Sequence, residues 1–175
     1  VLSLGFEYLA SVELPEIAGP ALEGLRDRTG ASAHLAIRDR DEIVYLCRVA
    51  SRSALTSSIR VGTRLAAHGS SMGRVLLADL PMDELSSLYL GHGFRRYTDQ
   101  TPANLDELRE MLDDDAKRGY VLSRSYHERG VVSAAAAIRD TTGDAVAAIN
   151  ITAAENSIAA VALEGAIKDD VVETA

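Results

Sequence analysis

The sequence has 175 residues and a formal net charge of −8, with 47% apolar and 25% charged residues. This length and balance predict one soluble globular domain with a core of its own. An acidic surface repels phosphate backbones, so we expect no contact with nucleic acid through these residues. No apolar run approaches the roughly 20 residues of a membrane span, and we expect no membrane partner.

Cys47 is the single cysteine and stands in the apolar run IVYLCRV. One thiol cannot form an internal disulfide, and its apolar neighbours predict a small buried side chain rather than a reactive one. Both features favour a reducing compartment, so we expect a cytoplasmic protein.

Helices are predicted at the start of the chain. Residues 1–12, VLSLGFEYLASV, carry a broad helical stripe of apolar side chains and predict the end of a connecting helix. The leucines of residues 14–30 share one helix face with Ile17, and Gly30 is a suitable end for that helix. Pro20 lies inside this pattern and is expected to kink or delay the helix.

The period of the apolar residues then changes from that of a helix to that of a strand. The runs at 31–40 and 42–50 are rich in β-forming residues and are separated by a turn-like Asp-Arg-Asp, which predicts a hairpin. The run TSSIRVG at 56–62 predicts a weaker third strand.

The second half of the chain predicts helices followed by a strand meander. A short helix is predicted at 82–93 and a clearer one at 104–120, where leucines recur every three or four residues. Residues 120–130 and 131–153 predict three strands, and residues 153–175 predict a closing amphipathic helix. No strand–helix–strand repeat dominates this order. The predicted fold class is therefore α+β, with a largely antiparallel sheet flanked by helices.

The sequence lacks the motifs of common enzymes and metal proteins. Neither the spacing of a phosphate-binding loop nor the GxSxG elbow is present, and the four histidines form no HxxxH or HExxH pair. The acidic runs at 113–115 and 169–170 predict solvated helix ends. Glu128, beside His127, predicts a polar strand end rather than a general base. We therefore expect no enzyme, no catalytic residue, no metal and no cofactor.

The stretch AHGSSMG, residues 67–73, leads from small and polar residues directly into the helical run RVLLADL. Small hydroxylic side chains, close backbone approach and free N–H groups at a helix start suit a pocket for a small anion such as a carboxylate. Taken alone, the stretch favours a second role over the pocket, because Ser70 or Ser71 can simply cap the helix. From these residues alone, both interpretations stay open.

Three longer stretches share a pattern with a known family. They are the opening run 1–49, VGTRLAAHGSSMGRVLLADL at 61–80, and 105–152, in which a helix ending in Gly-Tyr leads into the meander. In their order and spacing they resemble the effector-binding domain of the IclR family of bacterial transcriptional regulators. The short motifs LGFEYL and SMGR are similar to those of the subgroup that responds to protocatechuate and p-hydroxybenzoate.

The resemblance implies a GAF-like effector-binding domain over residues 13–175, with residues 1–12 as the end of a linker helix. Such a domain binds a small organic acid, aromatic acids included, and modulates DNA binding by an N-terminal winged helix-turn-helix that lies outside these residues. The implied partners are the effector, a homodimer or homotetramer, and DNA only through that absent domain. A GAF-like oligomerisation module without ligand sensing is the alternative.

The family's effector pocket can be transferred position by position onto this sequence. Asn150 and Thr152 stand two residues apart, and the period of a strand places both on one face, which supports the transfer independently. The implied effector-binding residues are Leu65, Ser71, Met72, Ser123, Val131, Ser133, Asn150 and Thr152.

Overall fold

The computed structural model of the chain describes residues 2–51, 59–91, 93–157 and 166–175. Its helices and strands follow one another as α1 (Leu2–Thr29), β1 (Ser32–Asp39), β2 (Glu42–Val49), β3 (Arg64–Ala66), the 3-10 turn η1 (Ala67–Gly69), α2 (Ser71–Leu77), α3 (Met82–Leu88), α4 (Leu105–Arg118), β4 (Val121–Arg124), β5 (Val131–Arg139), β6 (Ala145–Ala154) and α6 (Ala166–Thr174).

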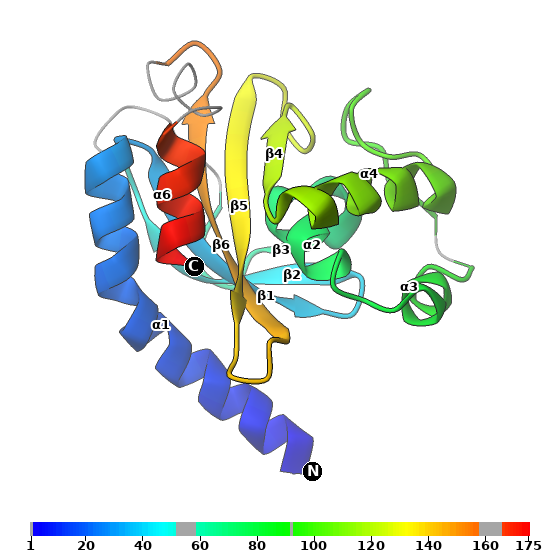
Figure 1. Cartoon of the computed structure of the whole chain (residues 1–175), viewed down its shortest axis with the longest axis horizontal. Coiled ribbons are helices and arrows are strands. Elements are labelled where there is room, and N and C mark those ends of the chain that lie inside the picture. Colours follow the sequence, from blue (N-terminus) through cyan, green and yellow to red (C-terminus); the bar gives the residue numbers. More distant parts are fainter. Residues whose placement is uncertain (1, 52–58, 92, 158–165) are drawn as a thin grey trace.

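The strands form a single sheet in the order β3-β2-β1-β6-β5-β4, and every neighbouring pair is antiparallel. Two hairpins, β1–β2 and β5–β6, are joined side by side through β1 and β6, so the two halves of the chain meet in the middle of the sheet (Figure 1). The predicted α+β class with a largely antiparallel sheet is confirmed.

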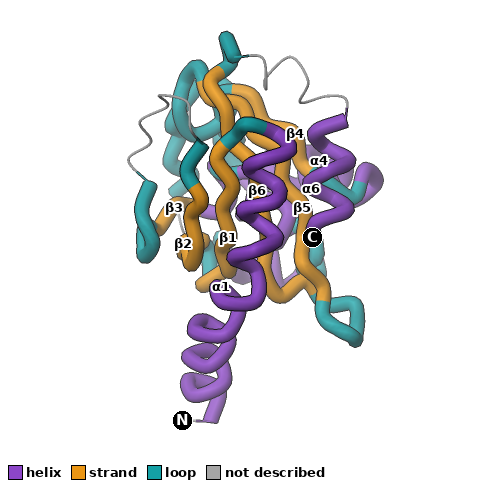
Figure 2. Tube along the Cα trace, turned by 90° about the vertical axis from the view of Figure 1, so that its left-hand side faces the viewer, coloured by secondary structure: helices purple, strands orange, loops and turns teal. Residues whose placement is uncertain are grey.

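Helices cover both faces of the sheet. On one face α1 and α6 lie next to each other, and Figure 2 looks onto this helical layer. Leu22, Leu25 and Val171 from these helices pack on Leu35 and on the alternate residues of β5 and β6 that point to that side. Cys47 is half-buried against this core, and burial raises the pKa of its thiol.

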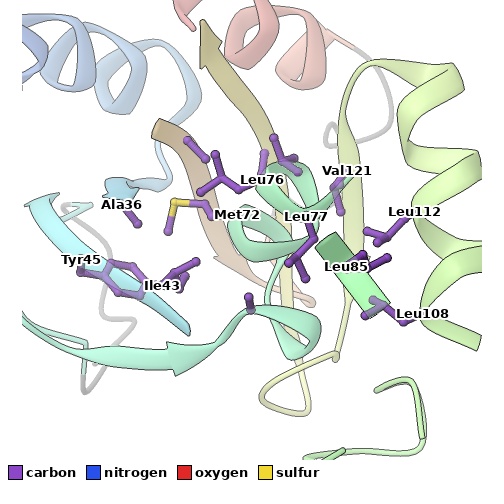
Figure 3. Packing of buried hydrophobic residues seen from close by; sticks show 14 of the residues in the cluster. Ala36, Ile43, Tyr45, Met72, Leu76, Leu77, Leu85, Leu108, Leu112 and Val121 are labelled. Carbon is purple, nitrogen blue, oxygen red and sulfur yellow. The ribbon is translucent and has the colours of Figure 1, made fainter. Parts of the chain in front are cut away.

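The other face carries α2, with α3 and α4 packed outside it (Figure 1). Its core includes Met72 and Leu76 of α2, Tyr45 of β2, and Leu108 and Leu112 of α4 (Figure 3). Alanines line much of the sheet surface beneath α2, because Ala36, Ala135 and Ala148 point to that side. Side chains this small let the helix lie close to the strands.

α2 begins at a tight junction with η1. Ser70 caps the helix, since its Oγ accepts the backbone N–H of Gly73 at 3.0 Å. At Gly73 the chain passes so close to Ala67 that an added Cβ would lie 2.2 Å from the carbonyl oxygen of Ala67. A residue without a side chain is therefore required at this position.

Three expectations about the elements need correction. The predicted third strand at 56–62 is wrong in its described part, residues 59–62, and residues 56–58 lie outside the described residues. Gly62, with φ of 83°, lies in a turn whose backbone already bonds to Tyr45 of β2, and the regular ladder with β2 begins at Arg64. The strand predicted at 120–130 ends at Arg124, and a loop follows. Residues 155–157 form a turn rather than the start of the closing helix.

Pro20 does not delay the helix, which was one of the two effects expected of it. α1 runs from Leu2 to Thr29 as one element that includes Pro15 and Pro20, and Figure 1 shows it bending along its course. Burial of Leu22 and Leu25 offsets the lost hydrogen bonds. None of the helices in the described ranges is long and apolar enough to cross a membrane.

The Gly73 junction can be tested by mutation. Gly73→Ala should lower the free energy of unfolding by about 1 to 3 kcal/mol or more, because the new methyl group meets rigid backbone. Urea unfolding followed by circular dichroism would measure this change. The matched control is Gly24→Ala in α1, where an added Cβ meets only the flexible end of the Arg28 side chain, at 3.2 Å, and where alanine should add about 0.5 to 1 kcal/mol. Equal unfolding midpoints for the two variants would contradict the packing described.

Candidate functional site

A cavity of about 80 Å³ lies between the start of α2, the sheet and the β4–β5 loop. This is several times the roughly 10 to 15 Å³ that a cavity needs to hold one water molecule. The residues that line it are Tyr45, Ile59, Leu65, Gly69, Ser70, Ser71, Ser123, Tyr126, His127, Glu128, Val131, Ser133, Asn150 and Thr152.

The structure brings together seven of the eight residues that the sequence singles out, namely Leu65, Ser71, Ser123, Val131, Ser133, Asn150 and Thr152. The eighth, Met72, is not among the lining residues. Its side chain is fully buried in the α2-side core (Figure 3). Successive residues of a helix point about 100° apart, so when Ser71 faces the cavity Met72 turns into the core.

A row of hydroxyl groups crosses three strands at the cavity. Ser123 of β4 is the register partner of Ser133 of β5, and Ser133 is also the partner of Thr152 of β6. Because antiparallel partners point to the same face of a sheet, the three hydroxyls stand side by side. The side-chain hydroxyls of Ser123 and Thr152 have no hydrogen-bond partner among the described residues. Their hydroxyls are therefore available to a molecule in the cavity.

Ser71 connects α2 to this polar surface. Its Oγ accepts a hydrogen bond from Ser133 Oγ at 2.9 Å and another from Asn150 Nδ2 at 3.3 Å. All three side chains are nearly inaccessible to bulk solvent. The first backbone N–H groups of α2 have no acceptor within the helix, so the cavity wall at Ser71 is rich in donors.

His34 lies behind Asn150 and does not line the cavity. It stands opposite Asn150 across the β1–β6 ladder, and its Nδ1 lies 2.9 Å from Asn150 Oδ1. Burial lowers the pKa of His34 to about 4, because the charged imidazolium would lose its water. At neutral pH the ring is therefore uncharged and carries one N–H hydrogen.

The β4–β5 loop forms the rim of the cavity. The carbonyl oxygen of Tyr126 accepts a 2.6 Å hydrogen bond from Thr101 Oγ1, and the ring of His127 lies 4.3 Å from that of Tyr97. Tyr97 also packs against Gly69, where an added Cβ would come within 2.8 Å of the tyrosine ring. The segment around residues 97–101 thus holds the rim in place from outside.

A buried ion pair fixes α2 on α4. Arg74 of α2 pairs with the carboxylate of Asp115 of α4, and both side chains are almost completely buried. Arg118 also pairs with Asp115, at 2.6 Å. The guanidinium of Arg74 lies 4.7 Å from the centre of the Tyr126 ring, within reach of a cation–π interaction. One charge cluster therefore secures both the helix and the rim loop.

This cluster corrects one expectation about the acidic run. Asp113 and Asp114 are exposed, as predicted for a solvated helix end, whereas Asp115 is 2% exposed. The prediction is wrong at Asp115 because Leu108 and Leu112 face the core, and Asp115 continues their stripe at the same spacing. The leucine spacing is a signal that could have placed Asp115 on the inner face, but only its partner Arg74 explains a buried charge there.

The interpretation of Glu128 as a strand end is also wrong. β4 ends at Arg124, so His127 and Glu128 lie on the loop, and both line the cavity. Burial lowers the pKa of His127. Within the described part of the chain, no three His, Cys, Asp or Glu side chains gather in a way that would hold a metal ion.

Sequence reasoning missed several residues of the site. The lining residues outside the expected set are Tyr45, Ile59, Gly69, Ser70, Tyr126, His127 and Glu128. Tyr45 lies in a strand whose alternating apolar residues indicate which face is buried. Such a pattern predicts a core residue and cannot show that the residue also lines a cavity. The loop residues depend on where β4 ends, which no periodicity signals.

The chain was then compared with known proteins. Residues 6–175 match the family of the bacterial transcriptional regulator IclR C-terminal domain. The chain belongs to this family. The repressor AllR of Salmonella paratyphi A, described as an HTH-type transcriptional repressor, is 31% identical over 152 residues. These residues are 87% of this chain but only 56% of the repressor.

Solved structures give the same assignment. A candidate transcriptional regulator from Rhodococcus sp. RHA1 is 37% identical with a TM-score of 0.88, and the match covers 99% of this chain and 71% of that one. A double mutant of the PobR inducer-binding domain from Acinetobacter, in complex with 3-hydroxybenzoic acid, is 26% identical with a TM-score of 0.84 over 91% and 94% of the two chains. The expected IclR family and GAF-like fold are both confirmed.

The buried histidine makes stability depend on pH. In the unfolded chain an imidazole titrates near pH 6.5, whereas folded His34 binds a proton only near pH 4. Its contribution is therefore fully present above pH 6.5 and lost as the pH falls towards 4, by up to about 3 kcal/mol.

His34→Leu should remove this part of the pH dependence. Urea unfolding at pH 7.5 and pH 4.5 should show a larger loss of stability in the wild type than in the variant. The other histidines and the carboxylates titrate in both proteins and cancel in the comparison. Parallel losses in the two proteins would show that His34 does not resist protonation in the folded state.

Proposed function

We propose that this chain is the effector-sensing part of an IclR-type transcriptional regulator and that its cavity binds a small organic acid, aromatic acids included. One observation carries the proposal: seven residues that the family resemblance names as effector-binding surround a single cavity. The PobR relative, crystallised with 3-hydroxybenzoic acid, supports an acid as the ligand class.

The chemistry of the wall supports an acid bound through neutral donors. Among the lining residues that the structure describes, none is a lysine or an arginine. Hydroxyl groups of Ser71, Ser123 and Thr152 and the first N–H groups of α2 would receive the carboxylate. Tyr45, Leu65 and Val131 would contact the apolar part of the ligand.

The proposal extends to DNA binding, domain organisation and oligomeric state of the whole protein. The chain spans about half the length of the AllR repressor that it resembles, and we infer that a winged helix-turn-helix N-terminal to residues 1–12 binds DNA. Residues 13–175 would then form the effector domain. A homodimer or homotetramer in the cytoplasm fits a regulator of this family. Its relatives are regulators, which supports a binding module rather than an enzyme.

A thermal-shift screen tests the proposal directly. The 175-residue chain should gain stability in a concentration-dependent way with at least one member of a panel of short-chain and aromatic acids that includes 3-hydroxybenzoate. A ligand at a hundred times its Kd adds about 2.7 kcal/mol. A flat response across the panel would remove the sensing role and favour the oligomerisation module.

Two cavity variants should weaken the response in different ways. Ser71→Leu should fill the cavity and abolish ligand-induced stabilisation while the fold stays intact. Asn150→Ala should weaken binding by roughly 1 to 3 kcal/mol, because it strands buried polar partners. Isothermal titration calorimetry would measure both effects.

The matched control for these variants is Asp114→Asn. Asp114 is an exposed residue of α4 whose carboxylate makes one surface ion pair, with Lys117. Exposed pairs contribute little, so binding should stay within the error of the wild type. If this change weakened binding as much as the two cavity changes did, the cavity would not be the binding site.

A further inference from the structure

The polar wall of the cavity has a second layer, formed by His34. This side chain is completely buried in the middle of the sheet, and one ring nitrogen, Nδ1, faces Asn150 Oδ1 at 2.9 Å. Asn150 in turn faces Ser71 with its Nδ2, at 3.3 Å. A continuous line of hydrogen bonds therefore runs from His34 to the hydroxyl group at the start of α2.

The position of a single hydrogen decides the direction of this line. With the hydrogen on Nδ1, His34 donates to Asn150 Oδ1, and the amide of Asn150 must donate to Ser71. With the hydrogen on Nε2, Nδ1 can only accept, and the amide of Asn150 would turn over. Its oxygen would then take the hydrogen of Ser71.

The surroundings of His34 favour the first arrangement. Nε2 is buried and has no hydrogen-bond partner. A hydrogen there would be an enclosed donor without an acceptor, and such orphaned N–H groups are rare in folded proteins. A hydrogen on Nδ1 meets the oxygen of Asn150 at once.

We propose that His34 is a positioning residue that makes the cavity a hydrogen-bond donor. Held with its hydrogen on Nδ1, it orients Asn150 so that Asn150 and Ser133 both donate to Ser71 Oγ, which leaves the hydrogen of Ser71 to point at a ligand. The inference rests on the proposed binding of an acid in this cavity. It adds a residue outside the cavity that determines selectivity for carboxylates.

This arrangement explains how a site without a lysine or arginine among its described lining residues can prefer an anion. A hydroxyl whose oxygen already accepts two hydrogen bonds is left with only its donor function. A carboxylate is charged and accepts hydrogens with both oxygens, whereas a carboxamide accepts with one oxygen only, and its N–H groups find no free acceptor on Ser71. The site therefore distinguishes an acid from its amide of almost the same shape.

The first experiment needs no ligand. Long-range ¹H–¹⁵N NMR correlations of His34 at pH 7 should place the ring hydrogen on Nδ1 in the wild-type chain. Asn150→Ala removes the acceptor and should shift the hydrogen towards Nε2. A wild-type ring with its hydrogen on Nε2 overturns the proposal, whatever the cavity binds.

The second experiment measures the ratio of affinities for 3-hydroxybenzoate and 3-hydroxybenzamide. His34→Leu should reduce this ratio by about 10- to 100-fold, the range expected when a hydrogen bond to a charged group is lost. A purely structural defect would weaken both ligands equally and leave the ratio unchanged, which would overturn the proposal.

A matched pair of variants separates hydrogen-bond direction from packing. The amide nitrogen of asparagine occupies the position of Nδ1, so His34→Asn should restore most of the ratio. In His34→Gln the amide lies one bond further along, near the position of Nε2, and the ratio should stay low. Equal ratios in these two variants would contradict the inference. If the wild type binds neither probe, 3-hydroxybenzoate is excluded as the effector, and the NMR result alone decides the role of His34.

Discussion

The cavity depends on one contact between a helix and the sheet, the pair of hydrogen bonds that Ser71 accepts from Ser133 and Asn150. They fasten the first turn of α2 to β5 and β6 at a point where polar groups are buried. Such groups are costly without partners, so a shift of the helix that broke these bonds would leave buried donors of Ser133 and Asn150 without their acceptor. The contact thereby fixes both the place and the polarity of the site.

Small residues make that contact possible. The alanines in the middle of β5 and β6 keep the sheet surface low, and Gly73 lets α2 pass close to the backbone of Ala67. Bulkier residues would lift the helix and separate Ser71 from the strands. The buried pair of Arg74 and Asp115 then resists the same movement from the outer side, because a helix that lifted would separate two desolvated charges.

The sequence predicts those features of the structure that depend on residues close together in the chain. Alternation placed Asn150 and Thr152 on one face, and the family pattern named their neighbours, because both signals are local. Met72 was assigned to the cavity because the pattern aligns residues without stating which way a helix is turned. The buried state of Asp115 needed knowledge of Arg74, 41 positions away, and no local pattern carries a partner at that distance.

The role of His34 also depends on a partner far away in the sequence. An alternating strand predicts only that its side chain points inwards, and an inward histidine has many uses. Its role appears when the ladder sets it opposite Asn150, a pairing between the two halves of the chain. The predicted extent of the first meander strand, 120–130, fails for a related reason. After Arg124 the chain is held by contacts of Tyr126 with Thr101 and Arg74, and the residues of the strand do not signal these contacts.

A donor wall without a cation also suits a protein that must respond reversibly. A lysine or arginine facing the cavity would itself have to lose water when an effector enters, and it would remain a buried charge whenever the effector left. Neutral hydroxyl and amide groups avoid that cost, because they carry no charge, and Ser71, Ser133 and Asn150 already bond to one another. Ser71 keeps two of its three hydrogen-bonding capacities engaged in either state, so only one hydrogen changes partner on binding. Selectivity is then set by the direction of that hydrogen, and affinity by the apolar contacts around it.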